Sequence, residues 1–388
     1  ICENVYWVGA IDWKLRNFHG YLTQRGSTYN AYLIIDEKVT LIDTVKHYLC
    51  EEMMTRIRSV IDPQKIDYLV CNHVEMDHSG SLPRVLASMP DAAVLTSPNG
   101  AKGLAKHYDV NGWNITTVQN GDTVCLGEKN LQFVLAQMVH WPDSMVTYLP
   151  EGKILFSNDA FGQHLASSER FDDQLPKGIV FSEAAKYYAN IVLSYGMQVQ
   201  KLLSQAGKLD IRVIAPSHGI VLRSFIPDIL DSYSRWSRNE TREKAVIVYD
   251  SMWGSTEKMA CALRDVFEAR DIDFSLMSLQ TNHISDIMTQ LLDARYICVG
   301  SPTLNNEMLP TVAAFLTYMK GLAPRKRTAI AFGSYGWGGQ SVKKIEDVLE
   351  ASQLHIPVRG LKINYVPSRE ALQELKCEVE QALFNVHE

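Results

Sequence analysis

The sequence predicts an α/β protein of two domains, a mixed α/β sandwich followed by a doubly wound parallel sheet. A length of 388 residues exceeds what one hydrophobic core usually serves. Short β-rich runs alternate with turns and helical stretches over residues 6–224, whereas the following residues repeat an apolar strand, a polar loop and a helix. We place the boundary near Thr241, which gives domains of residues 1–241 and 242–388.

The first domain is predicted from short apolar runs that are typical of strands. They occupy residues 32–35, 40–42, 68–70 and 93–95. Residues 232–244 are polar, and we interpret them as the end of a helix followed by a linker. The pattern of strands, loops and helices changes after this segment, which is the reason for the boundary.

The second domain is predicted from three apolar runs that each end in a loop rich in Gly, Ser, Thr or Asn, which is the doubly wound pattern. These runs are residues 245–249, 296–300 and 328–332. Residues 256–270 predict a helix, because four apolar side chains share one helical face: Met259, Leu263, Val266 and Phe267. We expect Ser255 or Thr256 to cap its N-terminus.

Composition excludes several classes of function. The chain is 46% hydrophobic and 21% charged, with a formal net charge of -6, so we expect neither a nucleic-acid partner nor a membrane partner. It contains no run of about 18 apolar residues. The first residues, ICEN, lack the basic and apolar regions of a signal peptide, and we therefore predict a cytoplasmic location.

The cysteines number seven and form no C-x-x-C pair. This argues against a disulfide framework and against iron or zinc held by cysteine. If the protein transfers electrons, an external donor must deliver them.

A dense group of metal-ligand residues follows the apolar run 66–71 in the segment NHVEMDHSG. Its candidate ligands are His73, Glu75, Asp77 and His78. Imidazole and carboxylate groups at alternate positions of a loop can converge on a metal, and a set without thiolates suits iron or manganese.

Three further candidate ligands, His140, Asp159 and His218, each follow an apolar strand-like run. His164, shortly after Asp159, is a candidate for a supporting role behind the ligands. The remaining histidines are predicted to be solvated or structural: His19, His47, His107, His283, His355 and His387.

The ligand order H-x-E-x-D-H, H, D, H resembles the metallo-β-lactamase superfamily over residues 5–225. That resemblance implies an αββα sandwich with two metals. Hydrolases of the superfamily usually carry His where this chain has Glu75, and the Glu form is similar to flavodiiron proteins. The family resemblance implies that one iron takes His73, Glu75 and His140, that the other takes Asp77, His78 and His218, and that Asp159 bridges them.

Three polar loops follow the predicted strands of the second domain. In the first loop, hydroxyl and amide donors at a helix start suit a phosphate monoester, and a P-loop Lys and a G-x-G-x-x-G motif are both absent. Its candidate residues are Ser251, Met252, Trp253, Gly254, Ser255 and Thr256. The other two loops carry glycines and aromatic residues that suit a flat ring. Their candidates are Pro302, Thr303, Leu304, Asn305 and Asn306, and then Ser334, Tyr335, Gly336, Trp337, Gly338 and Gly339.

Together these loops resemble flavodoxin over residues 245–388. The resemblance implies that the first loop holds the FMN phosphate and that the other two flank the isoalloxazine ring, with Trp337 or Tyr335 as stacking candidates. A metallo-β-lactamase-like αββα sandwich followed by a flavodoxin-like doubly wound parallel sheet is the arrangement of flavodiiron proteins.

The family resemblance implies a function and its partners. Flavodiiron proteins reduce dioxygen to water or nitric oxide to nitrous oxide at a non-haem diiron site, with electrons relayed through FMN. A separate rubredoxin or a reduced deazaflavin is the implied donor. The family also implies a head-to-tail homodimer or a dimer of dimers.

Two other functions remain open at this point. A dinuclear zinc hydrolase of the thioesterase or glyoxalase type would use the same scaffold, although Glu75 argues against it. An electron-carrier module whose first domain has lost its metal is the other alternative, and the complete ligand set argues against that.

Overall fold

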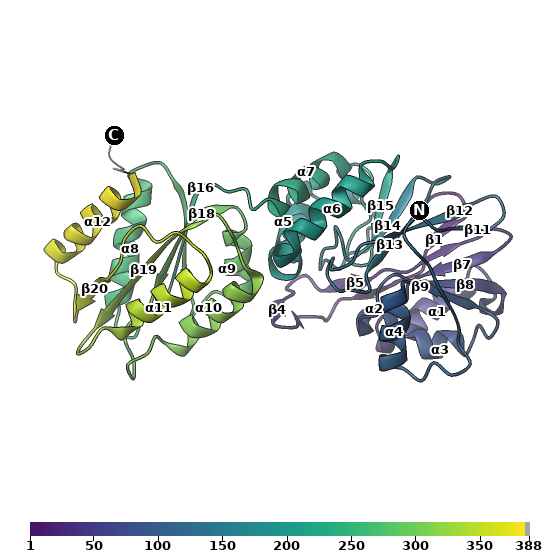
Figure 1. The fold of residues 1–388 in the computed structure, drawn as a ribbon, viewed down its shortest axis with the longest axis horizontal. Coiled ribbons are helices and arrows are strands. Elements are labelled where there is room, and N and C mark those ends of the chain that lie inside the picture. Colours follow the sequence, from purple (N-terminus) through teal and green to yellow (C-terminus); the bar gives the residue numbers. More distant parts are fainter. Residues whose placement is uncertain (385–388) are drawn as a thin grey trace. The chain divides into compact units, whose positions relative to one another are not determined.

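The computed structural model describes residues 1–384, so the last four residues of the predicted second domain, His387 among them, lie outside the described part. The chain forms two compact units (Figure 1). Unit 1 contains residues 1–19, 23–188 and 195–234, and unit 2 contains residues 20–22, 189–194 and the chain from residue 235 onward. The polar linker expected from the sequence lies between the end of α7 (Ile226–Ser237) and the start of β16 (Arg242–Tyr249).

Unit 1 is built on two sheets. The first has six strands in the order β1 (Val5–Trp7), β6 (Tyr32–Ile34), β7 (Val39–Ile42), β8 (Ile66–Cys71), β9 (Ala93–Thr96) and β10 (Asn114–Thr117). The second has five in the order β11 (Thr123–Cys125), β12 (Asn130–Leu135), β13 (Met145–Leu149), β14 (Ile154–Asn158) and β15 (Val213–Pro216). Both sheets mix antiparallel and parallel pairs. The predicted sandwich is confirmed.

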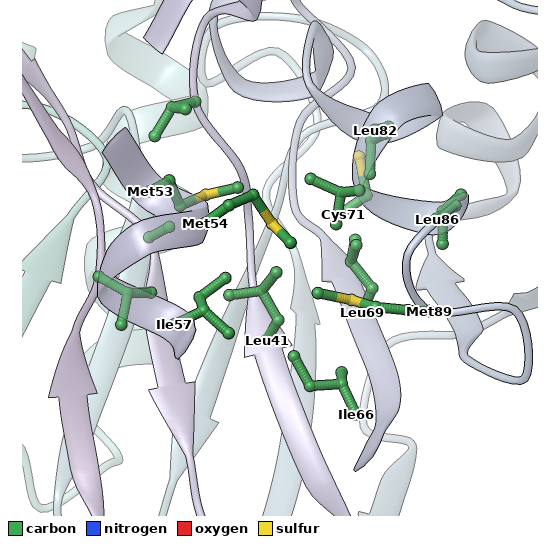
Figure 2. Close-up of a cluster of buried hydrophobic side chains, with 14 of the residues drawn as sticks. Leu41, Met53, Met54, Ile57, Ile66, Leu69, Cys71, Leu82, Leu86 and Met89 are labelled. Carbon is green, nitrogen blue, oxygen red and sulfur yellow. The ribbon is translucent and has the colours of Figure 1, made fainter. Parts of the chain in front are cut away.

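The core of unit 1 follows from strand periodicity. Neighbouring residues of a strand point to opposite faces of the sheet, so Leu41 and Leu69 enter one apolar cluster while Ile42 and Val70 enter another. Figure 2 shows the first cluster, in which side chains of α1 (Cys50–Arg58) lie together with side chains of β7 and β8. The second cluster also contains residues of the other sheet, so it is the interior of the sandwich.

Other elements of unit 1 connect or cover the sheets. The helices besides α1 and α7 are α2 (Met76–Ser79), α3 (Leu82–Leu86), α4 (Pro98–His107), α5 (Lys177–Tyr187) and α6 (Gly196–Ala206). Short strands β2 (Ala10–Asp12) and β5 (Ser27–Tyr29) pair antiparallel. Of the remaining short strands, β3 (Asn17–Phe18) belongs to unit 1, whereas β4 (Tyr21–Leu22) belongs to unit 2.

Unit 2 contains one parallel sheet. Its strands lie in the order β17 (Asp273–Ser278), β16, β18 (Ala294–Gly300), β19 (Thr328–Tyr335) and β20 (Leu361–Asn364). This 2-1-3-4-5 order is the flavodoxin-like version of the doubly wound fold. Its helices are α8 (Ser255–Glu268), α9 (Ile284–Leu291), α10 (Pro310–Leu322), α11 (Gln340–Ala351) and α12 (Arg369–Phe384). The predicted sheet is confirmed.

The start of α8 differs in detail from the sequence-based expectation. The predicted apolar face of this helix is buried, but the N-cap is Gly254, not Ser255 or Thr256. The backbone turns into the helix through a φ of 81° at Gly254, a conformation that glycine adopts without steric cost. The Thr256 hydroxyl instead lies 2.9 Å from the Ser334 hydroxyl.

Within residues 1–384, no helix has the length and apolar character needed to cross a membrane.

Candidate metal centre and flavin loops

All seven predicted metal ligands converge in unit 1. His73 and Glu75 follow β8, and Asp77 and His78 lie in α2 directly after them. His140 lies between β12 and β13, Asp159 follows β14, and His218 follows β15. Because these strand ends and loops meet at one edge of the sandwich, residues far apart in the chain become neighbours.

The first group of ligands is His73, Glu75, His140 and Asp159, whose donor atoms all lie within 4.8 Å of one another. Glu75 Oε2 lies 3.3 Å from His73 Nε2 and 3.3 Å from His140 Nε2. Ligands that each bind a metal at about 2.0–2.2 Å are separated from one another by roughly 3.0–3.5 Å. The spacing therefore fits a metal ion between them.

The second group is Asp77, His78 and His218, again with donor atoms within 4.8 Å of one another. Asp77 Oδ2 lies 3.3 Å from His218 Nε2, and Asp77 Oδ1 lies 3.5 Å from His78 Nε2. All three residues are buried. A second metal position beside the first is the arrangement that these distances support.

Asp159 connects the two groups through its two carboxylate oxygens. Oδ2 lies 3.2 Å from His140 Nε2 and 3.5 Å from His73 Nε2. Oδ1 lies 3.1 Å from His78 Nε2 and 3.4 Å from His218 Nε2. Each oxygen thus faces one group, which is the geometry of a carboxylate shared by two metals.

The hydrogen bonding of the cluster also fits metal binding. Both carboxylate oxygens of Asp77 and of Asp159 are buried without a hydrogen-bond partner among the described residues. Both ring nitrogens of His78 are likewise buried without such a partner. Buried polar atoms are normally satisfied. Metal ions at the two positions would satisfy the carboxylate oxygens and the His78 Nε2 that faces them.

In unit 2 the three predicted loops meet at the carboxyl ends of β16, β18 and β19. Ser334 and Tyr335, predicted in the third loop, lie in β19, which continues beyond the predicted strand end. The amide of Thr303 donates to the Ser334 carbonyl at 3.0 Å, which joins the second loop to the end of β19. The hydroxyl pair of Thr256 and Ser334 joins the first turn of α8 to the same strand end. The side chains of Trp253 and Trp337, in contrast, are exposed at the surface.

Comparisons with known proteins agree with both parts of this description. Residues 28–219 match the family described as "ODP family beta lactamase", and residues 247–376 match the flavodoxin family. The chain is 45% identical over 378 residues to a nitric oxide reductase of Moorella thermoacetica, covering 96% of this chain and 95% of the relative. It is 41% identical over 381 residues to a rubredoxin-oxygen oxidoreductase of Megalodesulfovibrio gigas, covering 97% and 95%.

A solved structure of the flavodiiron protein from Giardia intestinalis matches with a TM-score of 0.96 at 34% identity, over 98% of this chain and 95% of that one. The chain belongs to the flavodiiron protein family. As a flavodiiron protein it is an oxidoreductase with FMN and a non-haem diiron centre as its cofactors.

The electrostatics of this flavodiiron protein show how strongly the ligand cluster attracts cations. Burial opposes protonation of His73, but hydrogen bonds to Asp143 and Glu75 outweigh it and raise the pKa of His73 to about 10. Burial likewise opposes protonation of His78, yet the charges of Asp77 and Asp159 raise its pKa to about 9. Without metal, protons therefore supply the positive charge that the carboxylates require.

The pKa values of the carboxylates in the flavodiiron cluster are shifted downward, opposite to those of His73 and His78. Burial favours the neutral form of Asp159, but the charge of His78 and the nearby Nε2 atoms of His78 and His140 hold its pKa well below the ordinary range. Burial acts on Glu75 in the same way and is overcome by hydrogen bonds from His140 and His73, which lower its pKa. Both groups are anionic, as metal ligands must be.

Two residues that the sequence analysis did not select contact this flavodiiron cluster. His19, expected to be solvated or structural, is exposed, and its Nε2 lies 3.1 Å from Glu75 Oε1. Asp143 Oδ2 lies 2.9 Å from His73 Nδ1. No sequence motif near His19 indicates its contact, because it is 56 residues from Glu75. Asp143, in contrast, lies three residues after the candidate ligand His140, and this position is a signal for a supporting role.

His164, the expected supporting residue, lies behind the ligands of the flavodiiron protein. Its ring centroid is 5.0 Å from that of His218, and its Nδ1 lies 2.8 Å from the Ser27 hydroxyl. Burial lowers the pKa of His164 well below its ordinary value, so the ring is neutral. It packs against a candidate ligand and does not belong to either ligand group.

Proposed function

We propose that this chain reduces dioxygen to water, or nitric oxide to nitrous oxide, and that its seven candidate ligands hold the two irons. The observation that carries the proposal is the division of the Asp159 oxygens between two ligand groups, at 3.1–3.5 Å from four histidine nitrogens. The names of the two relatives, a nitric oxide reductase and a rubredoxin-oxygen oxidoreductase, support the two substrates.

In this assignment His73, Glu75 and His140 would hold one iron, Asp77, His78 and His218 would hold the other, and Asp159 would be shared by both. When bound, the diiron pair supplies adjacent binding positions and electrons for a diatomic substrate, and FMN supplies electron storage. The carboxylates of Glu75, Asp77 and Asp159 act as ligands and not as general bases.

A cavity of about 500 Å³ opens onto the metal centre and provides access for a small molecule. Glu75, Asp77 and His140 form its metal-side wall, and Phe18 and Trp141 line it with apolar surface. His19, Lys46 and His107 add polar groups to the lining. A diatomic gas offers few groups for recognition, so a small cavity with a partly apolar wall is suited to it.

In unit 2 we assign the first loop to the FMN phosphate. Gly254 leaves the entrance of α8 open, and nothing but the Glu257 carboxylate lies within 4.0 Å of the position that a side chain there would occupy. A helix start offers unpaired amides and a favourable dipole to a phosphate. The loops of Pro302–Asn306 and Ser334–Gly339 then flank the ring, with Trp337 or Tyr335 stacking on it.

We propose a rubredoxin as the electron donor, with a reduced deazaflavin as the alternative, and a head-to-tail homodimer or dimer of dimers as the assembly. The name of the Megalodesulfovibrio gigas relative supports a donor of the rubredoxin type. The assembly and a cytoplasmic location stay predictions. Light scattering of the purified protein tests the first, and cell fractionation tests the second.

The deciding experiment measures iron, zinc and FMN per chain, and then the anaerobic consumption of nitric oxide and the separate consumption of oxygen with reduced rubredoxin. Two irons, one FMN and turnover of either gas are expected. Zinc in place of iron together with ester hydrolysis would favour the hydrolase. Flavin reduction without turnover of either gas by an iron-free protein would favour the electron carrier.

A further inference from the structure

Asp143 is a buried carboxylate that belongs to neither ligand group, yet it is hydrogen-bonded to one of the ligands. Its side chain is 4% exposed. Its Oδ2 accepts from His73 Nδ1 at 2.9 Å and from the Val74 amide at 2.8 Å. Both donors therefore converge on a single oxygen.

The other buried ligand histidines are held differently. His218 Nδ1 lies 2.8 Å from the carbonyl oxygen of Thr28, and His78 Nδ1 has no hydrogen-bond partner among the described residues. A charged acceptor binds an N–H group more strongly than a neutral carbonyl does. His73 is thus the most firmly oriented of the three rings.

Asp143 also connects two loops that both serve the first ligand group. It lies three residues after His140 in the sequence, while its hydrogen bonds reach His73 and Val74 on the loop after β8. Its own carbonyl accepts from the Ser97 hydroxyl at 2.7 Å, so its backbone is fixed as well. Loss of this carboxylate would remove both of these hydrogen bonds between the two loops.

We propose that Asp143 is a positioning residue for the first iron. It holds His73 as the Nδ1–H tautomer, which leaves Nε2 free to face the metal. It also fixes the position of the His73 loop relative to the His140 loop. Among the described residues, Asp143 makes no hydrogen bond or ion pair with the second group. The proposal rests on the proposed function, because it assumes that His73, Glu75 and His140 take iron.

The convergence of both bonds on one oxygen makes two substitutions informative. In Asp143→Asn the amide oxygen can occupy the place of Oδ2, because the Val74 amide is a fixed donor and excludes the NH₂ group from that place. The geometry is then kept and only the charge is lost. In Asp143→Ala both hydrogen bonds are lost.

The test measures iron and FMN per chain, the electron paramagnetic resonance of the diiron pair, and the rate of iron loss to a chelator. We expect Asp143→Ala to retain about one iron per chain and a normal FMN content, without the signal of a coupled pair. Asp143→Asn should retain two irons and the coupled signal but lose the first iron about 10- to 100-fold faster, the usual effect of an outer hydrogen-bond partner.

Asp172→Ala is the matched control. Asp172 is a buried aspartate of unit 1 that accepts from the backbone amides of residues 223–225 and belongs to neither ligand group. Its loss should lower thermal stability while both irons remain. Equal iron loss in this control would overturn the proposal and indicate general destabilisation.

The proposal is also overturned if Asp143→Ala keeps a normal coupled pair, if it loses both irons together, or if Asp143→Asn releases iron at the unaltered rate. The last measurement decides the matter if the alanine variant does not fold. A parent protein without iron would instead contradict the proposed function, so the two failures are distinguishable.

Discussion

The candidate metal centre of unit 1 and the candidate flavin loops of unit 2 differ in the exposure of their aromatic and charged side chains. The seven candidate ligands have side chains that are at most 14% exposed, whereas Trp253 is 92% and Trp337 84% exposed. Charged ligands must be oriented by a surrounding scaffold, because a buried carboxylate without a partner is costly. A phosphate and a flat ring need only accessible amides, hydroxyls and an open surface. The metal centre should therefore be sensitive to single substitutions, and the flavin loops should be more tolerant.

The largest effect is expected from Asp159→Asn, because one oxygen that faces the metals is replaced by an NH₂ group. Turnover of oxygen and nitric oxide should fall by more than about 100-fold, beyond the usual effect of an outer hydrogen-bond partner. FMN content should not change. Activity within tenfold of the parent, with two irons present, would show that Asp159 is not a shared ligand.

A core substitution tests whether the two units are stabilised separately. Leu69 is fully buried in the cluster of Figure 2, and Leu69→Ala should reduce the stability of unit 1 by about 3 kcal/mol through lost burial and a residual cavity. Chemical denaturation followed by iron release for unit 1 and by flavin release for unit 2 measures the two units. An equal shift of both transitions would indicate that they unfold together.

Iron removal should make unit 1 sensitive to alkaline pH. The folded pKa of His73 is about 10 and that of His78 about 9, both above the ordinary value of about 6.5. Their contribution to stability is fully present below pH about 6.5 and is lost as the pH rises through 9 and 10. The melting temperature of iron-free unit 1 should fall on the order of 5 °C between pH 7 and pH 10.

Calorimetry of the iron-free and iron-loaded protein at both pH values measures this effect. The loaded protein should respond much less, because metal binding already requires neutral histidines. A melting temperature of the iron-free protein that rises with pH would contradict the charge assignment.

The smallest effect is expected at the flavin loops. Thr256→Val keeps the shape of a buried side chain but removes the hydroxyl that lies 2.9 Å from that of Ser334. FMN should bind about tenfold more weakly, which corresponds to one hydrogen bond of about 1.4 kcal/mol. Flavin titration of the apoprotein measures the affinity, and two irons per chain should remain. A loss of iron would show that the two centres are not independent.

Much of the fold could be predicted because strand and helix periodicity are local properties. The expected strands at residues 68–70 and 93–95 are parts of β8 and β9, and the helix after Gly254 begins within one residue of the expected start. The predicted N-cap was wrong because the backbone enters the helix through the left-handed Gly254, and the Thr256 hydroxyl lies 2.9 Å from the hydroxyl of Ser334, which is distant in the chain.

The sequence by itself determined the candidate ligand types, their order and the strand ends on which they lie, since a strand followed by a polar loop can be recognised within a few residues. Only the tertiary structure decided how these loops face one another: that Asp159 directs one oxygen to each ligand group, and that His19 and Asp143 contact ligands. Such contacts join residues 56 and 70 positions apart. They depend on the packing of two sheets, which local patterns of side chains do not encode.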